Sequence, residues 1–113
     1  MDVASLIIND KYDGKINVNQ ADQHGWTALH YLVSMGKLDK VEYLLSLNAI
    51  IDYPTFNHET ALHFAVFNND YSMVRLLMLN GANPLIRDVK SKRPIDRIKS
   101  KEMYTYLLSP TLD

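Results

Sequence analysis

The chain has 113 residues, of which 47% are hydrophobic and 22% charged, with a formal net charge of -1. This composition is typical of one globular domain and does not indicate a disordered or fibrous class. It has no cysteine, which excludes disulfides and thiol catalysis and is compatible with an intracellular location, cytoplasmic or nuclear. No apolar run approaches the ~18 residues of a membrane span, and the N-terminus lacks a secretory-signal pattern, so no membrane contact is expected.

The spacing of Val3, Leu6 and Ile7 along a single apolar face predicts one short helix between Met1 and Asp10. Asn9, Asp10 and the following Gly14 indicate a turn. No partner helix is predicted before this one, so its apolar face is expected to be open. Either a longer array has been cut here, or the helix is a cap that meets another subunit or domain.

The central part of the chain repeats itself. Residues 26–30 read Trp-Thr-Ala-Leu-His and residues 59–63 read Glu-Thr-Ala-Leu-His, 33 residues later, and Val41 and Val74 follow at the same spacing. A fixed period of this size predicts a solenoid of stacked helix-turn-helix units.

The residues that begin and end the helices also recur in both units. Thr27 and Thr60 are expected to cap the first helix of each unit. The two helices of the second unit are predicted over Ala61 to Asn68 and Met73 to Asn80. Gly36 corresponds to Asn69, and Asn48 to Gly81. Glycine and asparagine are the residues that best tolerate a positive φ, so the pattern predicts left-handed helix ends at all four positions.

The last unit is shorter and more basic. Pro94 replaces the alanine at a first-turn position where proline is tolerated, and Pro110 is expected to end the final helix. Residues 87–113 carry seven basic and four acidic side chains, whereas residues 1–86 carry five and nine. Acidic residues dilute these cations and no aromatic residues alternate with them, which favours a solvated polar cap over a nucleic-acid surface.

The pattern Asp-x-x-Gly-x-Thr-Ala-Leu-His, followed by Gly and by Val-x-x-Leu-Leu, resembles the ankyrin repeat. The resemblance implies an all-α ankyrin-repeat solenoid forming a single domain over residues 1–113. Its parts are a partial first repeat or N-cap (1–21), two repeats (22–54 and 55–87) and a shortened capping repeat (88–113).

The resemblance also implies that His30 and His63 bridge neighbouring turns by hydrogen bonds rather than bind a metal. His24 and His58 are not spaced to share a helical face with them, so no metal site is expected. No glycine cluster precedes a Lys-Ser/Thr pair, and no nucleophile is spaced with a base. The sequence therefore predicts no catalytic residues, no cofactor and no enzymatic activity.

Ankyrin-like repeats hold partners with their turn tips and with the exposed face of each first helix. Many residues at these positions are aromatic or large, which is typical of protein interfaces. The predicted partner-binding residues are His24, Trp26, Tyr31, Met35, Tyr53, Phe56, Glu59, Phe64, Phe67 and Asn68. They predict a non-catalytic module that binds a protein or peptide. The competing interpretation is that Trp26 and Phe56 pack on an adjacent turn while Phe64 and Phe67 cover the groove floor.

Three narrower alternatives remain open. The register resembles ankyrin domains that read a histone tail in the nucleus, although Tyr31 and Ser34 stand where those readers carry acidic and amide residues. A short, degenerate array also resembles viral ankyrin proteins that mimic inhibitors of host transcription factors. The third alternative is a structural role, in which the N-terminal helix joins two copies through Val3, Leu6 and Ile7.

Overall fold

The computed structural model of the chain describes residues 2–108. In chain order, its helices are α1 (Val3–Ile8), α2 (Ala28–Ser34), α3 (Leu38–Ser46), α4 (Ala61–Phe67), α5 (Tyr71–Leu79), the 3-10 helix η1 (Pro94–Arg97) and α6 (Glu102–Leu108). The described residues contain no strand, which agrees with the predicted all-α class.

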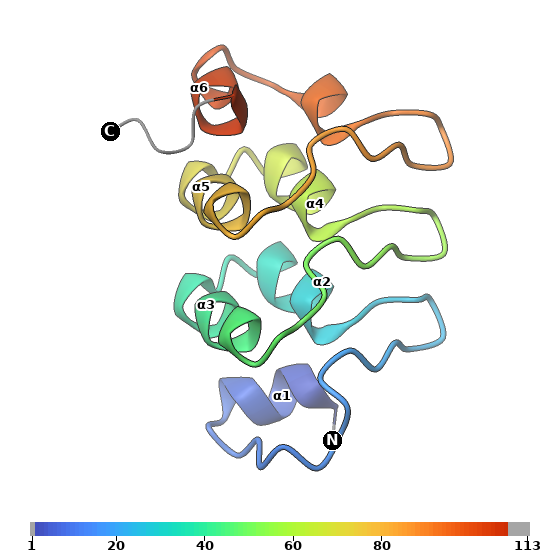
Figure 1. The fold of residues 1–113 in the computed structure, drawn as a ribbon, viewed down its shortest axis with the longest axis vertical. Helices are drawn as coiled ribbons and strands as arrows, with labels where there is room; N and C mark the ends of the chain where they lie inside the picture. Colours follow the sequence, from blue (N-terminus) through green and yellow to red (C-terminus); the bar gives the residue numbers. More distant parts are fainter. Residues whose placement is uncertain (1, 109–113) are drawn as a thin grey trace.

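The helices form pairs that are stacked along the longest axis of the molecule (Figure 1). Within the pairs, α2 packs on α3 and α4 on α5, and η1 and α6 are the two helices of the last unit. Between units, α2 packs on α4, α4 on η1, α3 on α5 and α5 on α6. The loops that lead into α2, α4 and η1 all project to the same side of the molecule (Figure 1). Each unit therefore buries its apolar face against its neighbours, as a solenoid requires.

Local signals account for the helix ends. Thr27 and Thr60 are the N-caps of α2 and α4, as predicted. Gly36 has a φ of 69° and Asn69 a φ of 54° in the turns that follow these helices. The predicted positive φ at Asn48 and Gly81 is also confirmed. Because both glycine and asparagine tolerate a positive φ, the two units share one backbone path although their residues differ at these positions.

The core lies between the helix layers and is built from the inward positions of each helix. Its fully buried large side chains include Leu29, Leu32 and Val33 of α2, Val41 and Leu44 of α3, Leu62 and Val66 of α4, and Met73 and Leu77 of α5. These positions recur at three- and four-residue spacings, so one face of each helix is apolar. Burying each such side chain contributes about 1.5 to 3 kcal/mol to folding.

The N-terminal helix differs from the expectation of an open apolar face. Val3 and Ile7 are buried in the chain's own core, where α1 packs on α2 and α3. Tyr12, Ile16 and Val18, from the long connection after α1, also pack against this core. Two of the three residues that motivated self-association, Val3 and Ile7, are therefore occupied within the chain, whereas Leu6 is half-buried.

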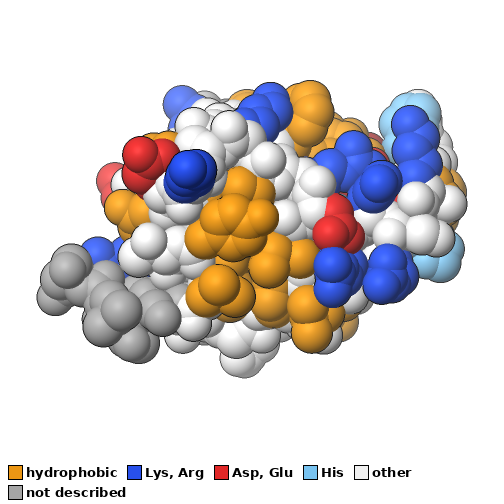
Figure 2. Space-filling view, turned by 90° about the horizontal axis from the view of Figure 1, so that it is seen from above, with side chains coloured by type: hydrophobic (Ala, Val, Ile, Leu, Met, Phe, Trp, Pro, Cys, Tyr) orange, Lys and Arg blue, Asp and Glu red, His pale blue; other side chains and the backbone are white. Residues whose placement is uncertain are grey.

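The last unit begins as predicted, with Pro94 at the first position of η1. Its surface is less uniformly polar than expected. In Figure 2, which looks at this end of the stack, an apolar patch lies between groups of Lys and Arg side chains. Val89, Tyr104 and Leu108 of this unit are exposed. Pro110, the predicted end of the last helix, lies outside the described residues. None of the helices within residues 2–108 combines the length and apolarity needed to cross a bilayer.

Candidate partner-binding surface

His30 and His63 are structural hydrogen-bonding residues. Nδ1 of His30 accepts the backbone N–H of Thr27 at 2.9 Å, so the ring proton resides on Nε2, which lies 2.8 Å from the carbonyl oxygen of Tyr53. His63 likewise accepts from the backbone of Thr60 at 2.9 Å and reaches the carbonyl oxygen of Lys92 at 3.0 Å. Each ring thus links one unit to the loop of the next, as the resemblance implied.

Burial keeps His30 neutral. Desolvation lowers the pKa of its imidazole, and the hydrogen bond to the Tyr53 carbonyl acts in the opposite direction without outweighing it. Both histidines are buried, and no group of three or more potential metal ligands occurs in the part of the chain that the structure describes.

The turn tips are joined to one another by backbone hydrogen bonds. The N–H of Phe56 donates to the carbonyl of His24 at 3.3 Å, and the N–H of Val89 donates to the carbonyl of Asn57 at 3.0 Å. Successive tips are therefore held at a fixed spacing. A partner that touches several tips meets a preorganised surface, which reduces the ordering cost of binding.

Three of the predicted residues form an aromatic cluster, defined here as Tyr31, Trp26 and Phe64. The Trp26 ring lies between the other two, with ring centroids 4.9 Å from Tyr31 and 4.7 Å from Phe64. The rings of His30 and Phe64 are perpendicular, with their centroids 5.7 Å apart. All three cluster residues are half-buried. The contact between Trp26 and Phe64 joins two units, so the cluster contributes to packing between units while part of it stays open to solvent.

Phe56 is the most exposed large hydrophobic residue of the predicted set, at 70%. Its ring rests on Gly25, where an added Cβ would come within 2.7 Å of the Phe56 ring and backbone nitrogen. The predicted packing on an adjacent turn is thus present, yet most of the side chain faces solvent. Phe56 borders a turn-tip pocket of about 420 Å³, whose other lining residues are His24, Trp26, Tyr31 and Asn57.

Phe67 ends α4 and is 54% exposed, with the ammonium of Lys99 lying 4.2 Å from its ring centroid. Together with Glu59 and Phe64 it lines a second, smaller pocket of about 180 Å³, which His63 and Arg97 complete. Three predicted residues of the second repeat, Glu59, Phe64 and Phe67, therefore line one hollow. From the last unit, Arg97 joins this lining and Lys99 lies over the Phe67 ring. Neither cation was among the predicted site residues.

The remaining predicted residues lie outside these hollows. Met35 and Asn68 follow the last residues of α2 and α4, where the Asn68 side chain reaches the carbonyl of Ser34 at 3.5 Å. Met35 is exposed. Tyr53 contributes its carbonyl to His30, so a structural role accounts for at least its backbone.

Asp22 is a functional candidate that the sequence reasoning used only as a marker of the repeat. One of its carboxylate oxygens accepts the backbone N–H groups of His24 at 2.9 Å and Trp26 at 3.0 Å. The other accepts the hydroxyl of Tyr31. The bond to Tyr31 is the largest cause of a lowered pKa at Asp22, and the same bond raises the pKa of Tyr31 to about 12.

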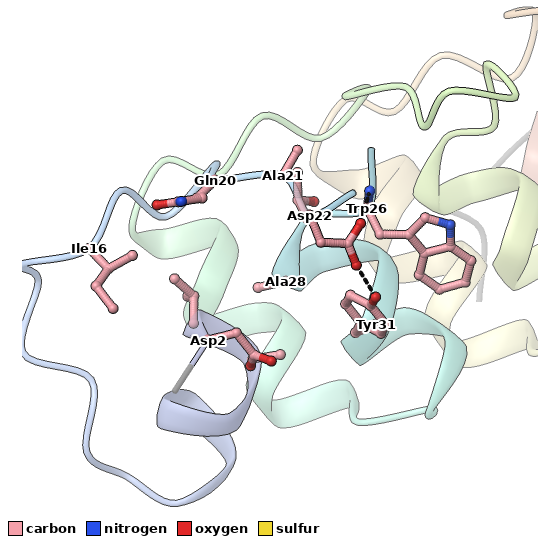
Figure 3. Close-up of a pocket in the computed structure, with 11 residues that line it drawn as sticks. Asp2, Ile16, Gln20, Ala21, Asp22, Trp26, Ala28 and Tyr31 are labelled. Atoms are coloured by element: carbon pink, nitrogen blue, oxygen red, sulfur yellow. Dashed lines mark hydrogen bonds between the residues drawn. The ribbon is translucent and has the colours of Figure 1, made fainter. Parts of the chain in front are cut away.

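A third pocket, called here the α1–α2 pocket, adjoins this pair and has a volume of about 300 Å³. Figure 3 shows Ile16 and Gln20 on one side of it, Asp22 and Tyr31 on the other, and Asp2 at the start of α1. Its lining residues are Asp2, Val3, Ala4, Ile16, Gln20, Ala21, Asp22, Trp26, Thr27, Ala28 and Tyr31. The sequence could not identify it, because the pocket forms where the connection after α1 meets α2, and a periodic pattern does not specify how their side chains lie in space.

The basic tail makes several local contacts that the charge count alone does not reveal. Arg93 forms a two-point ion pair with Asp96 at 2.9 Å for both contacts, and Arg97 pairs with the buried Asp88. Arg87 donates to the carbonyl of Ser91 at 2.8 Å. These arginines stabilise the loop and cap of the last unit, which supports the preference for a cap over a nucleic-acid surface.

Comparison with known proteins decides the family. A family model described as "Ankyrin repeats (3 copies)" matches residues 2–88. The chain belongs to the ankyrin-repeat family. Ankyrin repeats generally act as protein–protein interaction modules, and the solenoid, loops and bridging histidines described above are features of this ankyrin domain.

The relatives of this ankyrin chain are diverse. An ankyrin repeat protein of Borreliella burgdorferi is 31% identical over 87% of this chain and 24% of its own length. An ankyrin repeat protein of fowlpox virus is 32% identical over 74% of this chain and 20% of its own length. The chain thus spans about a quarter or less of these relatives. Among solved structures, the ankyrin repeat domain of Bcl-3 superposes with a TM-score of 0.82, at 21% identity, over 95% of this chain and 45% of that one.

Proposed function

We propose that this ankyrin domain binds a protein or peptide partner through the aromatic cluster and the exposed aromatic residues beside it, Phe56 and Phe67. The observation that carries the proposal is the arrangement of these rings around two adjacent hollows on the side of the loops and first helices. Phe56 and Phe67 remain more than half exposed although they border well-packed rings. Exposed aromatic residues next to concave apolar surface are the usual anchors of protein interfaces.

Two features support binding rather than catalysis as the role of this surface. The polar groups beneath it, His30 and His63, are both engaged in hydrogen bonds to backbone atoms. The rings above them supply apolar area and shape but no reactive group. The surface is therefore suited to recognition, with the linked turn tips providing rigidity.

The test uses exposed residues, so that loss of binding is separated from loss of folding. A library of displayed protein fragments is selected against the full chain, and the binding of each selected fragment is then measured against Phe56→Ala and Phe67→Ala. We expect each substitution to weaken binding about tenfold or more, as for interface anchors. Tyr43→Ala is the matched control, because Tyr43 is an exposed aromatic residue of α3, outside the proposed surface.

Circular dichroism checks that all three variants keep their helix content. Fragments that bind Phe56→Ala and Phe67→Ala as tightly as the original chain, or that respond equally to Tyr43→Ala, contradict the proposal. Reading of a histone tail and mimicry of a transcription-factor inhibitor stay predictions of narrower partners for the same surface.

A further inference from the structure

The α1–α2 pocket combines an apolar interior with negative charge at its rim. Val3, Ala4, Ile16, Ala21 and Ala28 supply apolar lining, and Asp2 and Asp22 supply two carboxylates. The lining contains no lysine, arginine or histidine. Within residues 2–108, neither carboxylate forms an ion pair with a basic side chain. Within the part of the chain that the structure describes, no lysine or arginine therefore neutralises the charge of this pocket.

The two carboxylates retain acceptor capacity. A carboxylate offers about four lone-pair sites. Asp2 uses one of them for the backbone N–H of Ser5, at 2.8 Å. Asp22 uses three, for two backbone N–H groups and the Tyr31 hydroxyl. Asp2 is therefore the better placed hydrogen-bond acceptor for an incoming donor, while Asp22 adds negative charge on the opposite side of the pocket (Figure 3).

The size of the pocket limits what can enter it. Its volume of about 300 Å³ lies at the lower end of the range of ligand pockets, which suits one long side chain better than a complete small molecule. Lysine and arginine carry an apolar stem and a cationic head, and they bury the stem while the head seeks polar partners. Apolar lining with carboxylates at the rim is complementary to both parts.

We propose that the α1–α2 pocket receives a lysine or arginine side chain of the protein partner. This inference rests on the proposed function, and it adds the chemistry of one partner residue. The pocket shares Trp26 and Tyr31 with the turn-tip pocket, so the two hollows are neighbours. A partner segment crossing the aromatic cluster would place its basic residue on the α1 side and its apolar residues on the Phe56 side.

The experiment titrates the full chain, labelled with ¹⁵N, with N-acetyl-lysine methylamide and N-acetyl-arginine methylamide. N-acetyl-norleucine methylamide, which has the lysine stem without the ammonium group, is the neutral probe. We expect saturable shifts of the amides of Ala21, Asp22 and Ala28 with the cationic probes, and weaker binding at high salt because charge attraction is screened. The norleucine probe is expected to bind several-fold more weakly.

Asp2→Asn provides the decisive variant. Asparagine caps helices about as well as aspartate, so α1 is retained while the charge is removed. We expect roughly two- to fivefold weaker binding of the cationic probes, the range typical of one exposed charge pair. Asp70→Asn is the matched control, because Asp70 caps α5 in the same way and does not line this pocket. It is expected to leave probe binding unchanged.

Three results would overturn the inference: no saturable shift near the pocket, equal binding of the norleucine probe, or unchanged binding in Asp2→Asn. These outcomes are independent of the fragment selection described above. If Phe56→Ala and Phe67→Ala abolish partner binding while the pocket does not bind the cationic probes, the proposed function stands and only this inference fails. If the pocket binds the cationic probes but the selected fragments bind Phe56→Ala and Phe67→Ala as tightly as the original chain, the aromatic surface is misassigned.

Discussion

The imidazole of His30 donates from Nε2 to the carbonyl oxygen of Tyr53, 2.8 Å away and 23 residues further along the chain. His63 and Lys92 make the equivalent contact in the next unit, at 3.0 Å. In each case a buried side chain on the first helix of one unit holds the loop that leads to the next unit. The spacing of the turn tips, and therefore the shape of the candidate surface, depends on these bonds.

Replacing His30 with alanine is expected to destabilise the fold strongly. The substitution leaves the Thr27 N–H and the Tyr53 carbonyl without their partner and removes a buried ring, which together cost about 2 to 5 kcal/mol. Urea unfolding followed by circular dichroism measures the loss. His24→Ala, which removes an exposed histidine of a turn tip, is expected to change stability by less than about 0.5 kcal/mol. Equal effects at the two positions would contradict the structural role of His30.

Stability is also expected to depend on pH through His30. Because burial lowers the pKa of the folded-state imidazole below 6.5, the unfolded chain binds the proton more readily. The contribution is fully present above pH 6.5 and is lost as the pH falls from there toward the folded-state pKa. Asp22 and Asp88 have lowered pKa values, so their contributions are lost only in more acidic solution, as the pH falls from about 3.8.

The pH effect is measured by comparing the free energy of unfolding at pH 7.5 and pH 5. The original chain should lose stability between these values, and His30→Ala should lose less because the titrating group is gone. An identical pH dependence in both proteins would show that another group controls it.

Two glycines provide a test of the contact between turn tips. Gly14 and Gly25 both have a positive φ, of 84° and 78°, but only at Gly25 would an added Cβ lie 2.7 Å from Phe56. Gly14→Ala is expected to cost about 1 to 2 kcal/mol from backbone strain alone. Gly25→Ala is expected to cost about 1 to 3 kcal/mol more, because the Phe56 backbone must move. Similar unfolding free energies for the two variants would contradict the close packing of Phe56 on this turn.

The buried face of α1 predicts that the N-terminal helix stabilises this chain rather than joining two copies. Ile7→Ala is expected to lower the free energy of unfolding by about 2 to 4 kcal/mol, because Ile7 is fully buried. Leu6→Ala, at a half-buried neighbour, is expected to cost less. Light scattering after gel filtration should give the same monomer mass for the original chain and both variants. A dimer that Leu6→Ala dissociates would restore the self-association alternative.

Tyr31 is expected to keep its proton in strongly basic solution. Its hydroxyl donates to the Asp22 carboxylate, and this bond raises the pKa of Tyr31 to about 12. NMR titration of a chain carrying ¹³C-labelled tyrosine measures the value, with Tyr31→Phe identifying the signal. Asp22→Asn should lower the pKa, since the negative acceptor is removed. A Tyr31 signal that titrates identically with and without Asp22→Asn would show that the bond does not form in solution.

The sequence by itself determined the repeated part of the fold. The period of 33 residues can be read directly from the chain. Residues within a few positions of one another set the caps at Thr27 and Thr60 and the turns at Gly36 and Asn69. Such local preferences act in the same way in every unit, so a second copy of the pattern confirms the first. The chemistry of His30 followed from family resemblance, because its partner carbonyl is 23 residues away.

The tertiary structure decided which of the predicted residues are available to a partner and which surfaces are closed. Phe56 is exposed while Trp26 is wedged between Tyr31 and Phe64, and the burial of Val3 and Ile7 reverses the expectation of an open N-terminal face. Contacts also form between residues far apart in the sequence: Asp22 meets Tyr31 across 9 residues, and Phe67 meets Lys99 across 32. The α1–α2 pocket depends on how the connection after α1 lies against α2. Side-chain exposure is set by neighbours in space, which a periodic pattern does not specify.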